Sequence, residues 1–282
     1  MDGGPNGSND IFLYYLAWFA IGACIGSFLN VCIYRMPKDR SIVWPGSHCP
    51  GCEHPIAWYD NLPILSFICL RRRCRHCRAA ISWRYPLVEA LTGALTVAIA
   101  ARFGAWPLGV VYIAFVAVLI VISFIDYDTK LIPNILSVGG LVASLILSPL
   151  VPALHGTTDG VLAFGRAALG AMVGCSLLYL TGSIGELIFR KEAMGLGDVD
   201  LLAMAGAFLG WKLVLLTFFL APLLAVVPGV VVLMTKRSHE IPYGPFLSIG
   251  LIVSLFFGQQ IIHASGIEET IRLLSDAYGW AR

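Results

Sequence analysis

The chain has 282 residues, of which 58% are hydrophobic and only 13% are charged. Its mean hydropathy of +0.80 is too high for an ordinary soluble domain, so the composition excludes that class and predicts a polytopic membrane protein. The net charge of +2 is small, and the distribution of the basic residues is more informative than their sum.

Eight hydrophobic runs follow one another, and we expect each to cross the membrane as a helix, for which roughly 20 apolar residues are needed. The segment before the first run lacks the basic residues of a cleaved signal peptide, so this run should remain as a membrane span. The runs cover residues 11–34, 86–103, 108–125, 133–151, 161–189, 199–209 (the shortest), 213–235 and 241–262. The predicted fold class is an all-α polytopic membrane protein with about eight transmembrane helices.

One sizeable hydrophilic segment, residues 36–84, separates the first two runs and is strongly basic. By the positive-inside rule it should be cytoplasmic, which places the N-terminus outside. Single-stranded nucleic acid binds where aromatic side chains lie among basic ones, and no aromatic residue lies between Arg71 and Arg78. We therefore expect no nucleic acid as a partner, and the hydrophobic runs lead us to expect membrane lipid. Four parts are predicted: an N-terminal segment with the first transmembrane helix (1–35), a cytoplasmic loop domain (36–84), a transmembrane core (85–262) and a C-terminal tail (263–282).

Two CxxC pairs lie within the hydrophilic segment, Cys49 with Cys52 and Cys74 with Cys77. Two such pairs separated by 21 residues fit a tetrahedral four-cysteine zinc site. The role of the zinc should be structural, because four protein ligands leave no open coordination position. Disulfides are the alternative, and a reducing cytoplasm disfavours them.

Two aspartates stand at the ends of hydrophobic runs, where a charge is costly unless it has a use. Asp126 follows the third run, and Asp198 precedes the sixth, in the sequence GLGD. Counting spans puts both at the cytoplasmic face. A helix C-terminus favours the protonated form of Asp126, and the free amides of a helix N-terminus favour the ionised form of Asp198. An aspartic protease needs this arrangement, in which one carboxyl group polarises the scissile carbonyl and the other takes a proton from water.

Other interpretations of these residues remain open. Asp126 and Asp198 can be cap or interface residues, and residue chemistry does not separate Asp126 from Asp128. Gly195 and Gly197 have no Cβ and let backbone or substrate approach closely. Glu89, in the second run, should face the bundle interior, either to orient a catalytic group or to pair with an arginine. Glycines spaced by four residues predict close helix packing at 22 and 26, 170 and 174, and 206 and 210.

Further motifs accompany the cysteines and the aspartates. They are GSFLNVCIYR (26–35), PGSHCP (45–50), NLPILS (61–66), RYPLVE (84–89), DYDTKLIPN (126–134), GLGD (195–198) and IPYGPF (241–246). With these motifs, which extend over nearly the whole chain, the sequence resembles the bacterial type IV prepilin peptidases, also called leader peptidase/N-methyltransferases. That family consists of GxGD-type membrane aspartic peptidases.

The resemblance implies that Asp126 and Asp198 are catalytic, because the family's first aspartate stands six residues before the residue preceding the proline, here Ile132. It implies cleavage of prepilin or pseudopilin precursors after a glycine, at the cytoplasmic side of the bacterial inner membrane. It also implies methylation of the new N-terminus from S-adenosylmethionine, for which the chain has no Gly-rich nucleotide loop as independent support. The chain departs from the family at Asp200, where a lysine is usual.

Two other classes of protein compete with this hypothesis. An ion-coupled transporter would use the two aspartates to bind cations, but such sites lie near the bilayer midplane between broken helices. The other is an inactive, zinc-stabilised scaffold of the pilus or secretion machinery.

Overall fold

The computed structural model describes residues 8–190, 194–235 and 242–266. Within these ranges the chain forms helices joined by turns and loops and has no strand, which confirms the predicted all-α class. The chain divides into two compact units, Met1–Pro133 and Asn134–Arg282. The start of the eighth run and most of the predicted tail lie outside the described residues.

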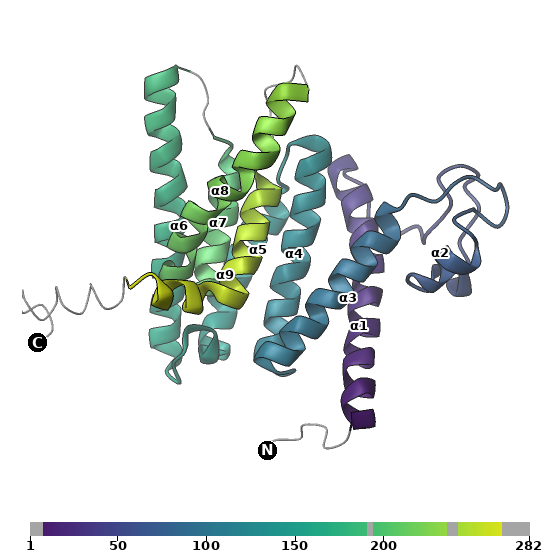
Figure 1. Cartoon of the computed structure of the whole chain (residues 1–282), viewed down its shortest axis with the longest axis horizontal. Helices are drawn as coiled ribbons and strands as arrows, with labels where there is room; N and C mark the ends of the chain where they lie inside the picture. Colours follow the sequence, from purple (N-terminus) through teal and green to yellow (C-terminus); the bar gives the residue numbers. More distant parts are fainter. Residues whose placement is uncertain (1–7, 191–193, 236–241, 267–282) are drawn as a thin grey trace, which may run out of the picture. The chain divides into compact units, whose positions relative to one another are not determined.

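The first unit is built on three long helices, with the hydrophilic segment looping out between the first two (Figure 1). Helix α1 lies along α3, and α4 packs against both. The elements in chain order are α1 (Ser8–Arg35), η1 (Met36–Lys38), η2 (Trp58–Asn61), α2 (Leu65–Cys69), α3 (Arg84–Phe103) and α4 (Leu108–Thr129). The loop segment therefore contains only short helices and must be held together by other means.

Two glycines of α1 allow α1 and α3 to approach closely. A Cβ atom on Gly22 would lie 2.5 Å from Oγ1 of Thr96, and one on Gly26 would lie 2.7 Å from Cα of Glu89. Side chains cannot approach that closely, so any larger residue would push the two helices apart. The close packing predicted from this glycine pair is confirmed, and it brings Glu89 directly against α1.

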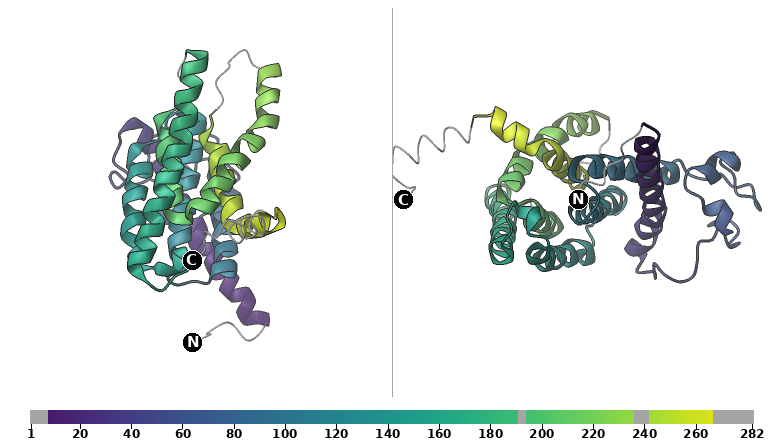
Figure 2. Two further views of the ribbon diagram at one scale, coloured as in Figure 1. Left: turned by 90° about the vertical axis from the view of Figure 1, so that its left-hand side faces the viewer. Right: turned by 90° about the horizontal axis from the view of Figure 1, so that it is seen from below.

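The second unit encloses one short helix among four longer ones (Figure 2). Every residue of α7 from Leu201 to Leu209 is buried, and α7 contacts α5, α6, α8 and α9. Against α6, a Cβ on either Gly170 or Gly206 would overlap the other's carbonyl group. The elements are α5 (Asn134–Leu150), η3 (Pro152–His155), α6 (Gly160–Phe189), α7 (Leu196–Leu209), α8 (Trp211–Thr235) and α9 (Gly244–Ala264).

Each of the eight expected spans corresponds to a helix, but the structure does not confirm eight membrane crossings. Among the described residues, six helices are long and apolar enough to cross a membrane: α1, α3, α4, α6, α8 and α9. Helix α5 has 17 residues and α7 has 14, so both are shorter than a straight span requires.

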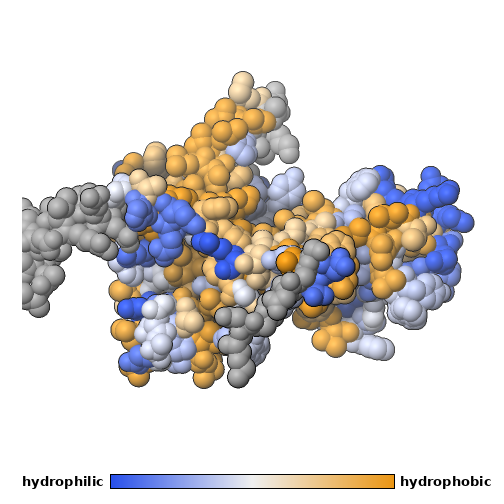
Figure 3. Space-filling model, turned by 60° about the horizontal axis from the view of Figure 1, so that its bottom comes forward, coloured by the Kyte–Doolittle hydropathy of each residue, from blue (hydrophilic) through white to orange (hydrophobic). Residues whose placement is uncertain are grey.

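On the face shown in Figure 3, hydrophobic residues cover much of the helices, and hydrophilic residues gather on the segment between α1 and α3 and in smaller patches elsewhere. Large hydrophobic side chains are well exposed, among them Phe12, Val161 and Leu187. Exposed apolar area of this extent marks a surface that contacts something other than water. For long apolar helices that environment is lipid, so the protein is a multi-pass membrane protein.

Candidate functional site

The four cysteines of the two CxxC pairs come together in the hydrophilic segment. Their sulfur atoms lie within 4.8 Å of one another, and Sγ of Cys49 is 3.8 Å from Sγ of Cys77. In a tetrahedral site with metal–sulfur bonds of about 2.3 Å, the sulfurs are about 3.8 Å apart. All four thiols are free of disulfides. The group can therefore hold a metal ion.

The two CxxC pairs adopt the same backbone turn. In each, the N–H of the first cysteine donates to the carbonyl five residues later, and its own carbonyl accepts from the N–H four residues later. That fourth residue has a positive φ in both turns, 56° at Glu53 and 61° at Arg78. Because one turn geometry recurs in two different sequences, each pair forms an equivalent half of the candidate metal site.

Asp126 lies in the last turn of α4 and is only 5% exposed. The sequence predicted that the third span ends at Asp126, whereas the helix continues through Thr129. It stops at Lys130, which adopts a left-handed conformation and donates its N–H to the carbonyl of Asp126 at 2.8 Å. Hydropathy falls at Asp126, but a backbone hydrogen-bond pattern does not end until a residue leaves the helical conformation.

The rival carboxylate, Asp128, is held by Arg84 at the start of α3. Nη1 of Arg84 lies 2.5 Å from Oδ2 of Asp128, and Nη2 donates to the carbonyl of Phe124 at 3.0 Å. These contacts fasten the α4 terminus at positions two residues before and two residues after Asp126. Asp128 is thus held by Arg84 at the surface, and its exposure distinguishes it from the buried Asp126.

Asp198, in the second unit, is the third residue of α7, whereas the sequence predicted it directly before a helix at 199–209; it lies at the helix N-terminus in both cases. Its N–H donates to the carbonyl of Gly195 at 3.2 Å, and a Cβ on Gly195 would lie 3.5 Å from Oδ2 of Asp198. The carboxylate therefore lies over the N-cap residue, beside the first amides of the helix. Gly197 is the neighbouring residue of the same turn, and the half-buried Asp200 follows in the next.

Tyr243, at the N-cap of α9, lies within electrostatic reach of Asp198. Burial, and then the negative charge of Asp198, raise the pKa of Tyr243 to about 12. A tyrosine hydroxyl is protonated at neutral pH, so Tyr243 carries a potential hydrogen-bond donor.

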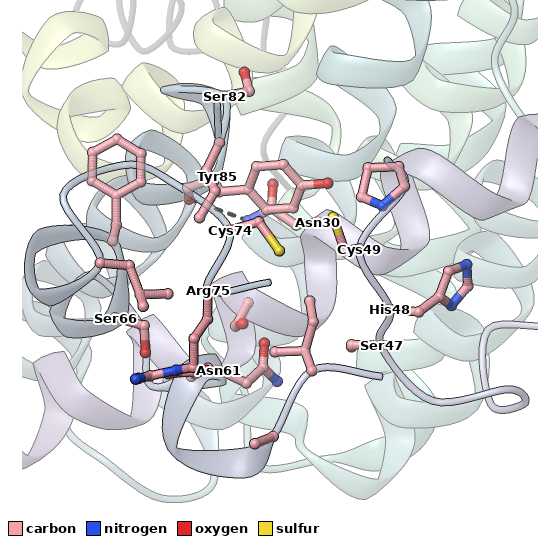
Figure 4. A pocket seen from close by; sticks show the side chains of 18 of the residues that line it. Asn30, Ser47, His48, Cys49, Asn61, Ser66, Cys74, Arg75, Ser82 and Tyr85 are labelled. Atoms are coloured by element: carbon pink, nitrogen blue, oxygen red, sulfur yellow. Dashed lines mark hydrogen bonds and ion pairs between the residues drawn. The ribbon is translucent and has the colours of Figure 1, made fainter. Parts of the chain in front are cut away.

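Glu89 lies on α3 beneath the hydrophilic segment and is 7% exposed. Its Oε2 accepts the N–H of Ile64 at 2.8 Å, and Ser27 of α1 also hydrogen-bonds the carboxylate. An arginine partner was one of two expected roles, but the described residues include no ion pair to Glu89. Instead, Glu89 lines a cavity of about 610 Å³ between α1, the loop segment and α3 (Figure 4).

Sequence reasoning did not single out Arg84, Tyr243 or two cavity residues, Asn30 and Arg35. Arginine, tyrosine and asparagine near a membrane edge are common, so residue type carries little signal. All four belong to the motifs at 26–35, 84–89 and 241–246, and those motifs were the available indication.

Two family models match the chain. The Bacterial Peptidase A24 N-terminal domain matches residues 20–103, and the Type IV leader peptidase family matches residues 113–230. The first range contains the four cysteines and the cavity, and the second contains both Asp126 and Asp198. No solved structure matches the chain.

Several curated proteins named prepilin leader peptidase/N-methyltransferase are similar to the chain. The protein from Myxococcus xanthus is 42% identical, over 82% of this chain and 69% of its own length. The protein from Aeromonas hydrophila is 34% identical, over 89% of this chain and 93% of its own length. The protein from Pseudomonas aeruginosa is 33% identical, with coverage of 88% and 92%.

Proposed function

This chain belongs to the type IV leader peptidase family, and we propose that it is a membrane-embedded aspartic endopeptidase. Its substrates are type IV prepilin or pseudopilin precursors, which it cleaves after a glycine, and it then methylates the new N-terminal amine. The observation that carries this proposal is the similarity to proteins of that name over more than four fifths of the chain. The motifs around both aspartates lie within the matched region.

In this proposal Asp126 and Asp198 act as a pair. Asp198, at the N-terminus of α7, is the carboxylate that takes a proton from the attacking water. Asp126 acts as a carboxylic acid and donates a hydrogen bond to the scissile carbonyl. The water oxygen adds to the carbonyl carbon, and the proton passes to the leaving amine as the C–N bond breaks.

We further assign zinc to the four cysteines, because thiolates in a tetrahedral set are the ligands of structural zinc. The methyl donor in this proposal is S-adenosylmethionine. The hydrophilic segment and both aspartates face the cytoplasm, and the N-terminus faces outward, as the distribution of arginine in the segment supports.

The test is cleavage of a purified prepilin by the full-length protein in detergent micelles. We expect Asp126→Asn and Asp198→Asn each to reduce the initial rate by about a thousandfold or more. When two residues catalyse a step together, the loss of one costs nearly as much as the loss of both. Asp128→Asn is the matched control, with the same chemical change two residues away. Cleavage at the wild-type rate by both Asp126→Asn and Asp198→Asn would refute the peptidase mechanism. A transporter or an inactive scaffold would then be the remaining hypotheses.

A further inference from the structure

The cavity between α1, the loop segment and α3 is well formed and lies outside the peptidase region. Its volume of about 610 Å³ is within the range of small-molecule sites, about 300–1,000 Å³. All residues that line it fall between Ser27 and Glu89, inside the match to the N-terminal domain at 20–103. In Figure 4 its wall includes Asn30 and Tyr85 from the helices and Cys49 and Cys74 from the metal site.

Two buried charged groups line this cavity without an oppositely charged partner among the described residues. Glu89 accepts hydrogen bonds from Ile64 and Ser27, which are both neutral. Arg35 is 6% exposed and donates to the carbonyls of Ser41 and Gly46. Burying a charge is costly unless it is paired, so a carboxylate and a guanidinium in one cavity favour a ligand that carries both a cation and a carboxylate.

Asn30 supplies a further group for a ligand. It is 5% exposed, and its Nδ2 donates to the carbonyls of Gly26 at 3.3 Å and Tyr85 at 3.2 Å. These bonds fix the amide, whose oxygen has no hydrogen-bond partner among the described residues. A fixed acceptor in a cavity wall selects ligands that present a donor.

Flat aromatic faces complete the lining. Tyr59, Phe67 and Tyr85 contribute rings to the cavity wall, and such rings pack well against a purine. The backbone of Ile64 has a φ of 61°, which is rare for a β-branched residue. Its N–H bond to Glu89 links this loop residue to α3 and fixes one wall of the cavity.

We propose that this cavity binds S-adenosylmethionine, which presents an ammonium and a sulfonium cation, a carboxylate and a purine. The inference rests on the proposed methyltransferase activity and assigns it to the N-terminal unit. Glu89 pairs with a cation of the donor and Arg35 with its carboxylate. In the transfer, the neutral N-terminal amine of the cut substrate forms a C–N bond to the methyl carbon. The C–S bond breaks, the thioether leaves, and the amine loses its extra proton to water.

The basic leader of the substrate is the competing occupant. A leader would bring lysine or arginine side chains toward the buried guanidinium of Arg35 and toward Arg75, and like charges at close range repel. Arg75 already forms a bidentate ion pair with Asp60, at 2.6 and 2.7 Å, so the cavity contains one uncompensated carboxylate and one uncompensated guanidinium. That balance fits a zwitterionic ligand better than a polycation.

The experiment measures binding of S-adenosylhomocysteine, the unreactive product, to the full-length protein in micelles by isothermal titration calorimetry. Glu89→Gln keeps an acceptor for Ile64 and removes the charge, and we expect its dissociation constant to rise by about tenfold or more. Tyr59→Leu should weaken binding by several fold. Trp58→Leu is the matched control, because Trp58 is the adjacent aromatic residue, is 79% exposed and does not line the cavity. Metal content and the thermal unfolding midpoint report folding of each variant.

The outcomes separate this proposal from the function on which it rests. If the wild type binds S-adenosylhomocysteine and methylates a cleaved pilin peptide while Glu89→Gln and Tyr59→Leu bind it normally, the cavity assignment is overturned and the methyltransferase function stands. If the wild type neither binds it nor methylates, both fall. If Glu89→Gln loses binding of a leader peptide but retains S-adenosylhomocysteine, the cavity belongs to the substrate and the proposal is wrong.

Discussion

At the scale of single residues, two aspartates two positions apart have different surroundings. Asp126 is buried in the last turn of α4, whereas Asp128 is partly exposed and paired with Arg84. Arg84 also binds the carbonyl of Phe124, so one side chain holds the backbone that carries Asp126. We interpret Arg84 as a positioning residue for Asp126.

This interpretation predicts unequal effects of two substitutions. Asp128→Asn removes a partly exposed ion pair worth about 0–1 kcal/mol, so we expect the cleavage rate to fall by less than about fivefold. Arg84→Ala removes both the ion pair and the hydrogen bond to Phe124. We expect its kcat to fall by about tenfold or more, with little change in KM. Initial rates on a purified prepilin measure both.

Arg84→Lys provides the control, because lysine keeps the charge but cannot bridge Asp128 and Phe124 with one planar fork. Its rate should fall between those of Asp128→Asn and Arg84→Ala. Equal rates for all three variants would show that the contact to the Phe124 carbonyl has no role in positioning Asp126.

At the scale of elements, helix packing in both units depends on glycines that let backbones touch. Helices α6 and α7 meet at Gly170 and Gly206, and α7 carries Asp198 in its first turn. Without a strong hydrophobic driving force between helices in lipid, close van der Waals contact is a main source of association. The position of Asp198 therefore depends on a contact made elsewhere on its helix.

Gly170→Leu should separate α6 from α7 and lower the thermal unfolding midpoint by at least about 5 °C, since overpacking a core costs about 1–3 kcal/mol. Gly165→Leu lies on the same helix, where a Cβ would meet nothing within 4 Å, and should change the midpoint little. Differential scanning fluorimetry in detergent compares the two. A similar midpoint for both would contradict the packing argument.

At the scale of the whole molecule, two kinds of stabilisation operate. The helices are held by apolar and small-residue packing, whereas the hydrophilic segment contains only the short helices η1, η2 and α2. A segment with so little regular structure buries too little apolar surface to offset its conformational entropy. A metal ion held by the four cysteines would supply the missing cross-link, and two of these cysteines, Cys49 and Cys74, also line the proposed donor cavity.

Removal of the metal should therefore release the segment and leave the helices intact. With a strong zinc chelator, we expect four additional cysteines to react with N-ethylmaleimide, counted by intact mass, and amide exchange in α4 and α7 to stay unchanged. In the Cys49→Ser, Cys77→Ser double variant the remaining two cysteines should react without chelator. An unchanged thiol count after chelation would exclude a metal at this site.

Much of the function was predictable from local sequence. The two CxxC pairs, the GLGD stretch and the apolar runs are short-range patterns, so their residues indicate chemistry without knowledge of the fold. Helix ends were less well predicted, because the end of an apolar run and the end of a hydrogen-bonded helix are different properties, as Asp126 and Thr129 show.

The sequence by itself determined the all-helical membrane class, the four cysteines of the candidate metal site, and Asp198 with Asp126 or Asp128 as the candidate carboxylates, because these follow from composition and local spacing. The resemblance to a known family chose Asp126 over Asp128. Only the tertiary structure decided which side chains surround these residues and which contacts they make. Arg84 reaches Asp128 across 44 positions, and Glu89 reaches Ile64 across 25. Such contacts depend on how α1, α3 and α4 pack, and no local pattern specifies them. The cavity with Glu89 and Arg35 exists only because the folded loop segment covers α1 and α3, so no local sequence pattern could indicate it.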